Sequence, residues 1–285
     1  MTSDPQGARD ATVAALREAI GAVEATSADL VRKPPPPQEA PPPKKRRTPP
    51  KQNPDGSWPP ITYPGMPEGD DWMHNLPARY RDGQRGHDRR IMEELAAVGV
   101  PCYTVSELAD RAETVPQGIP IFIDWLTHLE ERVPGPESDH REILRSGLIC
   151  ALDDPAARGN QRAIDLLIQQ LRRQPPLAGP VRDFTEYALA HIATKTDFPA
   201  IAALIDELPP DYPRGALIEY LGRVKTSEAQ AIALHWLDNG YAYFAIKALV
   251  SMKAIGVRDR VAPYVNDHDP WVRKVAKRAM ERLPE

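Results

Sequence analysis

The chain has 285 residues and a formal net charge of −4 at pH 7, with 32 prolines and only four phenylalanines. Its two cysteines, Cys102 and Cys150, stand at no metal-ligand or redox spacing, which excludes a disulfide framework. No run approaches the roughly 18 apolar residues that a membrane span needs, so we expect a soluble, cytoplasmic protein without a membrane partner.

The prolines and charges are unevenly distributed. Fourteen prolines lie between Pro34 and Pro67. Residues 1–66 hold nine Lys and Arg against seven Asp and Glu, whereas the remainder holds 27 against 33. A mildly acidic folded part argues against non-specific nucleic-acid binding as its main role.

Residues 1–33 predict a short amphipathic helix. Val13, Leu16, Ile20 and Val23 recur at spacings of three, four and three, which is the seam of a helix or a coiled-coil fragment. Gly21 weakens this pattern, and an isolated helix of this length is marginal in water. The segment is either a docking helix or a loosely helical, Ala-rich tail.

Residues 34–78 predict a proline-rich, disordered linker, because they offer too little apolar surface to offset the entropy of ordering. One dense basic patch lies within it. This patch fits a nuclear import signal or a phosphate-contacting site, although we prefer a solvated run that keeps the linker extended. It consists of Lys44, Lys45, Arg46 and Arg47.

Residues 79–285 predict an all-α domain that begins with three short helices. The first carries Ile91 and Leu95, the second begins at a capping box of Thr104 and Glu107, and the third begins at Pro120. Inner and outer helices then alternate. We expect inner helices at 141–152, 181–192, 213–224, 241–252 and 270–283, and outer helices at 164–171, 201–208, 229–237 and 258–265.

The inner helices share one apolar anchor, at Leu148, Leu189, Leu221, Leu249 and Met280, with intervals of 41, 32, 28 and 31 residues. Self-similarity at this period is typical of an α-solenoid, in which short helices bury their apolar stripes by stacking. We expect a curved, right-handed solenoid of about five helix pairs.

Local signals support this register. Asp154 precedes Pro155 and Asp269 precedes Pro270, which places a side-chain acceptor before a proline at the first helical position. Pro263 lies inside the last outer helix, so we expect that helix to be short or kinked near Val261. The final helix carries an exposed cationic face around its core positions, formed by Arg273, Lys274, Lys277, Arg278 and Arg282.

The segment from Asp269 to Met280, DPWVRKVAKRAM, resembles the D-x-x-V-R-x-x-A-x-x-A-L signature of HEAT repeats, including the short bacterial repeats first described in phycobilisome lyases. Residues 243–249 and 217–222 resemble weaker copies, and residues 91–152 are similar to HEAT-repeat proteins of high-GC bacteria. Only the final copy keeps the Asp together with the Val-Arg pair. The resemblance implies the fold and says little about activity, since such repeats serve scaffolds, regulators, lyases and DNA-repair enzymes.

Catalytic and metal sites are not indicated. His268 lies between Asp267 and Asp269 on an expected turn, where capping explains the two carboxylates. Asp124 beside Trp125 invites comparison with HEAT-like alkylpurine DNA glycosylases, but their chemistry needs a strongly cationic surface for DNA. We therefore expect no enzyme, no cofactor and no metal.

The inner helices of a solenoid supply its concave face. Residues outside their apolar seams are the candidate binding residues, although a solvated polar face explains them too. They are Arg145, Glu219, Arg223, Tyr241, Tyr243, Lys247, Arg273 and Lys277.

These features predict a non-enzymatic scaffold or adaptor that binds protein partners. The alternative is a DNA-associated HEAT protein that uses the basic patch and the C-terminal helix. In the preferred hypothesis the leader binds one partner and the concave face another, with the linker setting their effective concentration.

Overall fold

The computed structural model describes residues 51–69, 71–80, 86–110 and 114–284. The chain divides into two units, Met1–Arg46 and Arg47–Glu285, and every described residue belongs to the second. The expected leader helix of residues 1–33, the first part of the linker and the basic patch of Lys44, Lys45, Arg46 and Arg47 lie outside the described residues.

Within the described ranges the second unit is all-α, with no strand, as predicted. The segments that lead into the array include α2 (Arg89–Ala97), a 3₁₀ helix (Val105–Asp110), α3 (Ile119–Thr127) and α4 (Leu129–Arg132). The second expected helix, after Thr104, is thus a 3₁₀ helix, and α4 is an addition to the three that the sequence predicts. The inner helices are α5 (Asp139–Leu152), α7 (Gly179–Ile192), α9 (Gly215–Val224), α11 (Ala242–Met252) and α13 (Pro270–Arg282). The outer helices are α6 (Gln161–Arg172), α8 (Phe198–Glu207), α10 (Ser227–Asp238) and α12 (Arg258–Val261). Each expected helix of the array is present, with its ends shifted by a few residues.

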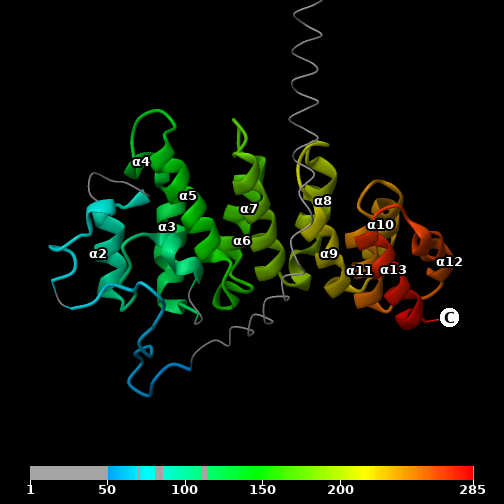
Figure 1. Cartoon of the computed structure of the whole chain (residues 1–285), viewed down its shortest axis with the longest axis horizontal. Coiled ribbons are helices and arrows are strands. Elements are labelled where there is room, and N and C mark those ends of the chain that lie inside the picture. The colour runs from blue at the N-terminus through cyan, green and yellow to red at the C-terminus, as the bar shows by residue number, and fades with distance from the viewer. Residues whose placement is uncertain (1–50, 70, 81–85, 111–113, 285) are drawn as a thin grey trace, which may run out of the picture. The chain divides into compact units, whose positions relative to one another are not determined.

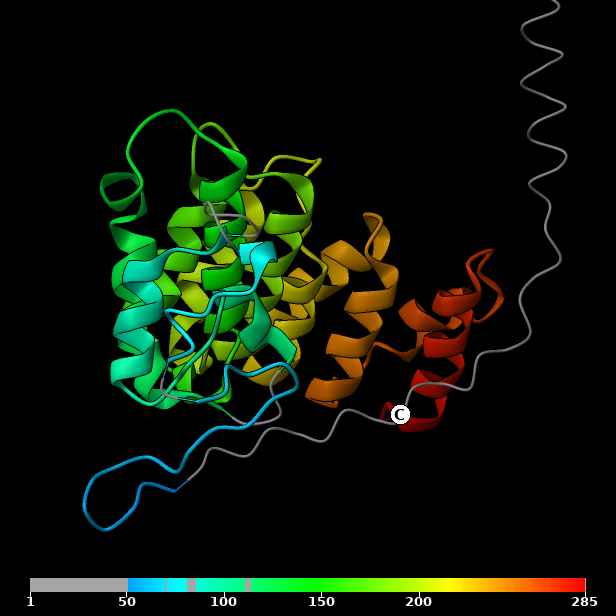
Figure 2. The same cartoon turned by 60° about the vertical axis from the view of Figure 1, so that its left-hand side comes forward.

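The inner helices follow one another in chain order from α5 to α13 (Figure 1), and the view turned by 60° keeps α11 and α13 at the end of the row (Figure 2). The main contacts join α5 to α7, α7 to α9, α9 to α11 and α11 to α13, while α6, α8 and α10 pack against the inner helices next to them. Each layer therefore depends on its neighbours, which is the packing of a solenoid.

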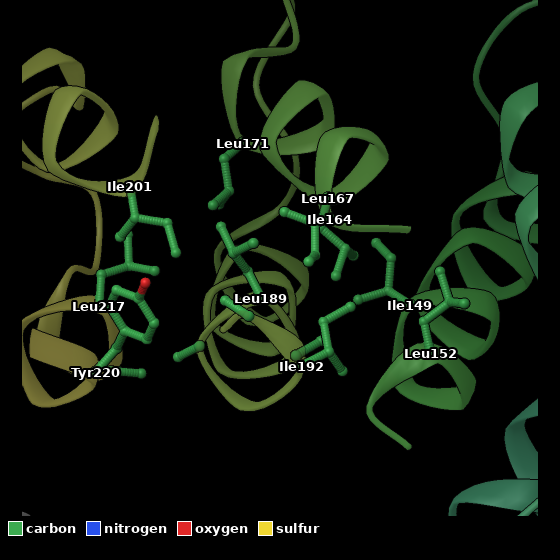
Figure 3. Packing of buried hydrophobic residues seen from close by; sticks show 14 of the residues in the cluster. Ile149, Leu152, Ile164, Leu167, Leu171, Leu189, Ile192, Ile201, Leu217 and Tyr220 are labelled. Carbon is green, nitrogen blue, oxygen red and sulfur yellow. The ribbon is translucent and has the colours of Figure 1, made fainter. Parts of the chain in front are cut away.

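A continuous apolar core joins the layers. Figure 3 shows side chains of the inner helices, such as Leu189 of α7, beneath Ile164 and Leu167 of α6. Four of the five expected anchors are fully buried, at Leu148, Leu189, Leu221 and Leu249. Met280 is only partly buried, because no described helix packs against the far side of α13.

Local signals act as expected at the end of the array. The Asp269 side chain accepts a hydrogen bond from the Trp271 amide at 2.7 Å, and Pro270 is the first residue of α13. The preceding α12 stops at Val261 and continues as a 3₁₀ helix, Ala262–Asn266, because Pro263 cannot donate the hydrogen bond that an α-helix requires.

The expected start of the domain at residue 79 is too late. Ile61 and Tyr63 are buried in the core, and the Tyr63 hydroxyl donates to the Pro101 carbonyl at 2.8 Å. The ring of Trp72 meets Tyr103 edge-on, at a centroid distance of 5.5 Å. Composition favours disorder here because prolines dominate, but isolated aromatic and branched side chains pack this segment against the core and the loop that follows α2.

Candidate functional site: the inner groove

A groove of about 670 Å³ opens along the inner helices of the second half of the array. We call it the inner groove. Residues of α7, α9, α11 and α13 line it: Tyr187, Ala190, His191, Ala216, Glu219, Tyr220, Arg223, Tyr243, Lys247, Val250, Ser251, Trp271, Lys274, Val275, Arg278, Ala279 and Arg282. The stacking of successive inner helices brings these residues together across nearly 100 positions of sequence.

Four of the candidate binding residues lie in the inner groove, and three of them are linked. Lys247 of α11 donates through Nζ to Oε2 of Glu219 on α9 at 2.5 Å. The same Nζ lies 5.2 Å from the centre of the Tyr243 ring. The contacts place a neutralised charge pair beside an aromatic ring at the α9–α11 boundary.

The fourth, Arg223, is held in place by α7 and α9. Its guanidinium donates to the Ala190 carbonyl and lies 5.1 Å from the centre of the Tyr220 ring. Burial lowers the pKa of Arg223 and raises the pKa of Tyr220 to about 12. The Tyr220 hydroxyl donates to the Thr194 carbonyl at 2.5 Å. Both side chains are thus fixed before any ligand arrives.

One wall of the inner groove is cationic. Lys274, Arg278 and Arg282 recur every four residues along α13, are exposed, and form no ion pair within the described part of the chain. Trp271 precedes them by one turn and is 64 % exposed, with the Lys274 Nζ 5.7 Å from its ring centre. This wall therefore offers a row of positive charge next to an exposed indole.

The opposite end of the inner groove belongs to α7. Tyr187 is 45 % exposed, and its ring lies 6.2 Å from that of His191. The His191 Nδ1 is 2.8 Å from Oδ1 of Asp153, and this hydrogen bond raises the pKa of the imidazole. A second aromatic side chain and a readily protonated one thus complete the lining.

Four other candidate residues lie outside the inner groove. For one of them, Arg145, the prediction of an exposed side chain is wrong. Arg145 is only 2 % exposed, because Glu130 and Glu137 hold its guanidinium at 3.2 and 3.1 Å. A polar residue outside the apolar seam was expected to be exposed, but carboxylates from a neighbouring loop and helix cover it. Arg145 belongs to an ion-pair network in which the guanidinium is buried and its partner carboxylates are partly exposed.

The remaining three have local roles or lie on another face. Tyr241 packs edge-on against Trp236 and donates through its hydroxyl to the Tyr212 carbonyl at 3.3 Å. Arg273 donates to the carbonyls of Asp267 and His268 at 2.7 and 2.8 Å, so it holds the turn before α13. Lys277 is exposed on α13 but does not line the groove.

The sequence does not predict the binding residues at the two ends of the groove. Tyr187, His191 and Trp271 carried no signal beyond their place on an inner helix. Lys274, Arg278 and Arg282 were recognised as exposed cations, and their spacing of four already put them on one face of the helix. That this face lines the groove follows only from the packing of α13 on α11.

The residues compared with a glycosylase site have structural partners instead. Trp125 is fully buried, and its Nε1 donates to Glu94 at 2.8 Å. Arg132 bridges Glu94 and Asp124 and lies 4.4 Å from the centre of the Trp125 ring. Asp124 is therefore part of an ion-pair cluster that closes over an aromatic core residue.

Among the described residues, no group of three His, Cys, Asp or Glu side chains could hold a metal ion. No helix in the described ranges has both the length and the apolar character to cross a membrane. Comparison of the chain with protein-family models, curated proteins and solved structures gives no significant match. The function has to be argued from the groove itself.

Proposed function

We propose that this chain is a non-enzymatic protein-interaction module built of HEAT-like repeats, and that the inner groove is its binding surface. The observation that carries the proposal is the groove lining, which combines two exposed aromatic rings, Tyr187 and Trp271, with partnered polar groups on α7, α9 and α11 and exposed cations on α13. Exposed aromatic side chains next to arginine are typical of binding hot spots.

A single-site enzyme is disfavoured by the arrangement of the ionisable groups. Among the described residues, Glu219 is the only carboxylate of the lining, and Lys247 engages it at 2.5 Å. A general acid or base acts on a substrate atom within hydrogen-bond reach, in a site that holds the substrate in one position. The lining instead spreads its polar groups along an open surface, which suits an extended contact.

Site-specific photo-crosslinking tests the proposal. A photoreactive p-benzoylphenylalanine replaces Tyr187 in the full chain, expressed in its native cell, and crosslinked proteins are identified by mass spectrometry. The matched control carries the same group at Ile255, which is 72 % exposed and does not line the groove. We expect a discrete protein crosslinked from position 187 and absent from position 255.

The identified protein is then purified and titrated against the full chain by calorimetry. Saturable binding that Tyr187→Ala weakens about tenfold or more, and Ile255→Ala leaves unchanged, supports the proposal. Crosslinks to nucleic acid alone would favour the DNA-associated alternative instead. Binding equally strong in both variants would overturn the groove as the interaction surface.

A further inference from the structure

We infer that the inner groove takes an acidic peptide segment bearing an apolar anchor residue, with its carboxylates on the row of Lys274, Arg278 and Arg282 and its anchor on Trp271. This inference rests on the proposed function, because it names the partner chemistry of the same groove. Three features of the lining support it.

The first feature is charge. Among the described residues of the lining, five cationic side chains stand against one carboxylate, Glu219, which leaves a local charge of +4 before any positive charge on His191 is added. The region from residue 67 onward has the opposite balance, with 27 Lys and Arg against 33 Asp and Glu. A positive groove in an acidic unit attracts an anionic ligand into the groove and repels it elsewhere.

The second feature is the repulsion between the positive charges of the row. Like charges four residues apart on a helix repel each other. Lys274, Arg278 and Arg282 make two such pairs on α13. Nearby carboxylates relieve comparable charge elsewhere, as Glu207 does for Arg172 at 2.7 Å. No described carboxylate pairs with the row, so a ligand's carboxylates would supply the missing partners.

The third feature is the aromatic surface at the start of the row. Trp271 is 64 % exposed and lies one turn before Lys274 on the same helix. A peptide that alternates carboxylates with an apolar side chain can contact both at once. Burying such a side chain on an indole removes apolar surface of both groups from water, which favours binding.

A peptide fits this lining better than a nucleic-acid strand. Glu219 lies inside the groove, where it would face the phosphates of a bound strand, and its partner Lys247 is already neutralised. A strand also needs a continuous cationic track for its backbone. Here the Glu219–Lys247 pair separates Arg223 on α9 from the row on α13, and the region from residue 67 onward is acidic overall.

Fluorescence anisotropy with the full chain tests the inference. The probe is a fluorescein-labelled peptide of repeated Glu-Glu-Leu units. Glu-Glu-Ser repeats remove the anchor, Lys-Lys-Leu repeats invert the charge, and labelled oligothymidylate represents a nucleic-acid strand. We expect saturable binding of Glu-Glu-Leu, about tenfold weaker binding of Glu-Glu-Ser, and no binding of Lys-Lys-Leu. Affinity should fall as added salt screens the charges.

The matched variants are Lys274→Glu and Lys277→Glu, which make the same charge change on the same exposed helix, inside and outside the groove. We expect Lys274→Glu to weaken Glu-Glu-Leu binding about tenfold or more, and Lys277→Glu to change it less than about threefold. Trp271→Ala should abolish the preference for leucine over serine. Circular dichroism establishes that each variant is folded.

Equal losses in Lys274→Glu and Lys277→Glu would overturn the inference, since they would show non-specific charge attraction. So would tighter, Lys274-dependent binding of oligothymidylate, which would assign the groove to nucleic acid. A crosslinked partner whose affinity ignores Lys274→Glu would overturn this chemistry while the proposed function stands. The absence of any groove-dependent protein partner would instead remove the proposed function.

Discussion

The carboxylate of Glu186 on α7 accepts a hydrogen bond from the backbone amide of Ala216, in the first turn of α9, at an N–O distance of 2.5 Å. The same Oε1 accepts from the Leu217 amide at 3.2 Å. The amides at a helix start have no partner within their own helix, so Glu186 caps α9 from the preceding layer. Its side chain is buried, which makes this junction sensitive to pH.

Burial raises the pKa of Glu186 from 4.5 to about 7, against the opposing effect of the two amide hydrogen bonds. Below pH 4.5 the group is protonated in both states, so its burial carries no charge penalty. As pH rises toward 7, the unfolded chain ionises first, and folding stability falls by up to about 3 kcal/mol.

Glu186→Gln should remove this loss, because a neutral amide oxygen can accept the same two hydrogen bonds. Compared with the wild type, we expect equal stability near pH 4.5 and a variant more stable by up to about 3 kcal/mol near pH 8. Urea unfolding at a series of pH values measures the difference. A stability difference between Glu186→Gln and the wild type that is the same near pH 4.5 and near pH 8 would contradict the raised pKa of Glu186.

Gly222 allows α9 and α11 to approach closely. A Cβ at this position would lie 2.7 Å from the Ser251 Cβ and 3.0 Å from backbone atoms of Ala248. Gly222→Ala gains about 1 kcal/mol in helix propensity, but the rigid clash should outweigh it and lower stability by a net 1–2 kcal/mol, roughly. Gly179→Ala is the control, since its nearest atom would be 3.9 Å away. A melting temperature of Gly222→Ala equal to or above that of the wild type would contradict the close approach of α9 and α11.

Lys253 ends α11 with a left-handed backbone, at φ 57°. Non-glycine residues in this conformation cost roughly 1–2 kcal/mol, so Lys253→Gly should raise the free energy of unfolding by about 1 kcal/mol. Lys277→Gly, in the interior of α13, should lower it by about the same amount. Chemical denaturation of both variants checks the opposite signs, and a loss of stability in Lys253→Gly would show the prediction to be wrong.

Ile61 anchors the proline-rich segment in the hydrophobic core. It is buried in the core, whereas its neighbour Thr62 is exposed. Ile61→Ala should cost about 2–4 kcal/mol, and Thr62→Ala should stay within about 0.5 kcal/mol. Limited proteolysis between residues 51 and 80 gives a second readout, as loss of the anchor should expose this segment. Equal stability of the two variants would mean that the segment contributes nothing to the fold.

We expect Trp125 to contribute to the stability of the fold and Trp271 to contribute to binding only. Trp125 is fully buried and Trp271 is 64 % exposed. Trp125→Ala should lower the free energy of unfolding by about 3–5 kcal/mol, whereas Trp271→Ala should change it by less than about 0.5 kcal/mol. Differential scanning calorimetry of the two variants tests this contrast. A large loss of stability in Trp271→Ala would make it a core residue rather than a binding surface.

The sequence by itself determined the helices and their order. Periodicity and caps act over a few residues, so Asp269 and Pro270 mark the start of α13, and Pro263 marks the end of α12, wherever the rest of the chain lies. The repeated anchors also required stacking, because a short helix cannot bury its apolar stripe alone. This reasoning placed Glu219, Arg223, Tyr243 and Lys247 correctly on inner helices.

Only the tertiary structure decided what covers each polar side chain. Arg145 and Arg278 both lie outside the apolar stripe of an inner helix, yet Glu130 and Glu137 bury the first while the second lines the groove. Ile61 and Tyr63 likewise join the core despite their proline-rich surroundings. Burial depends on neighbours distant in the chain, and a local pattern of residues does not contain those contacts.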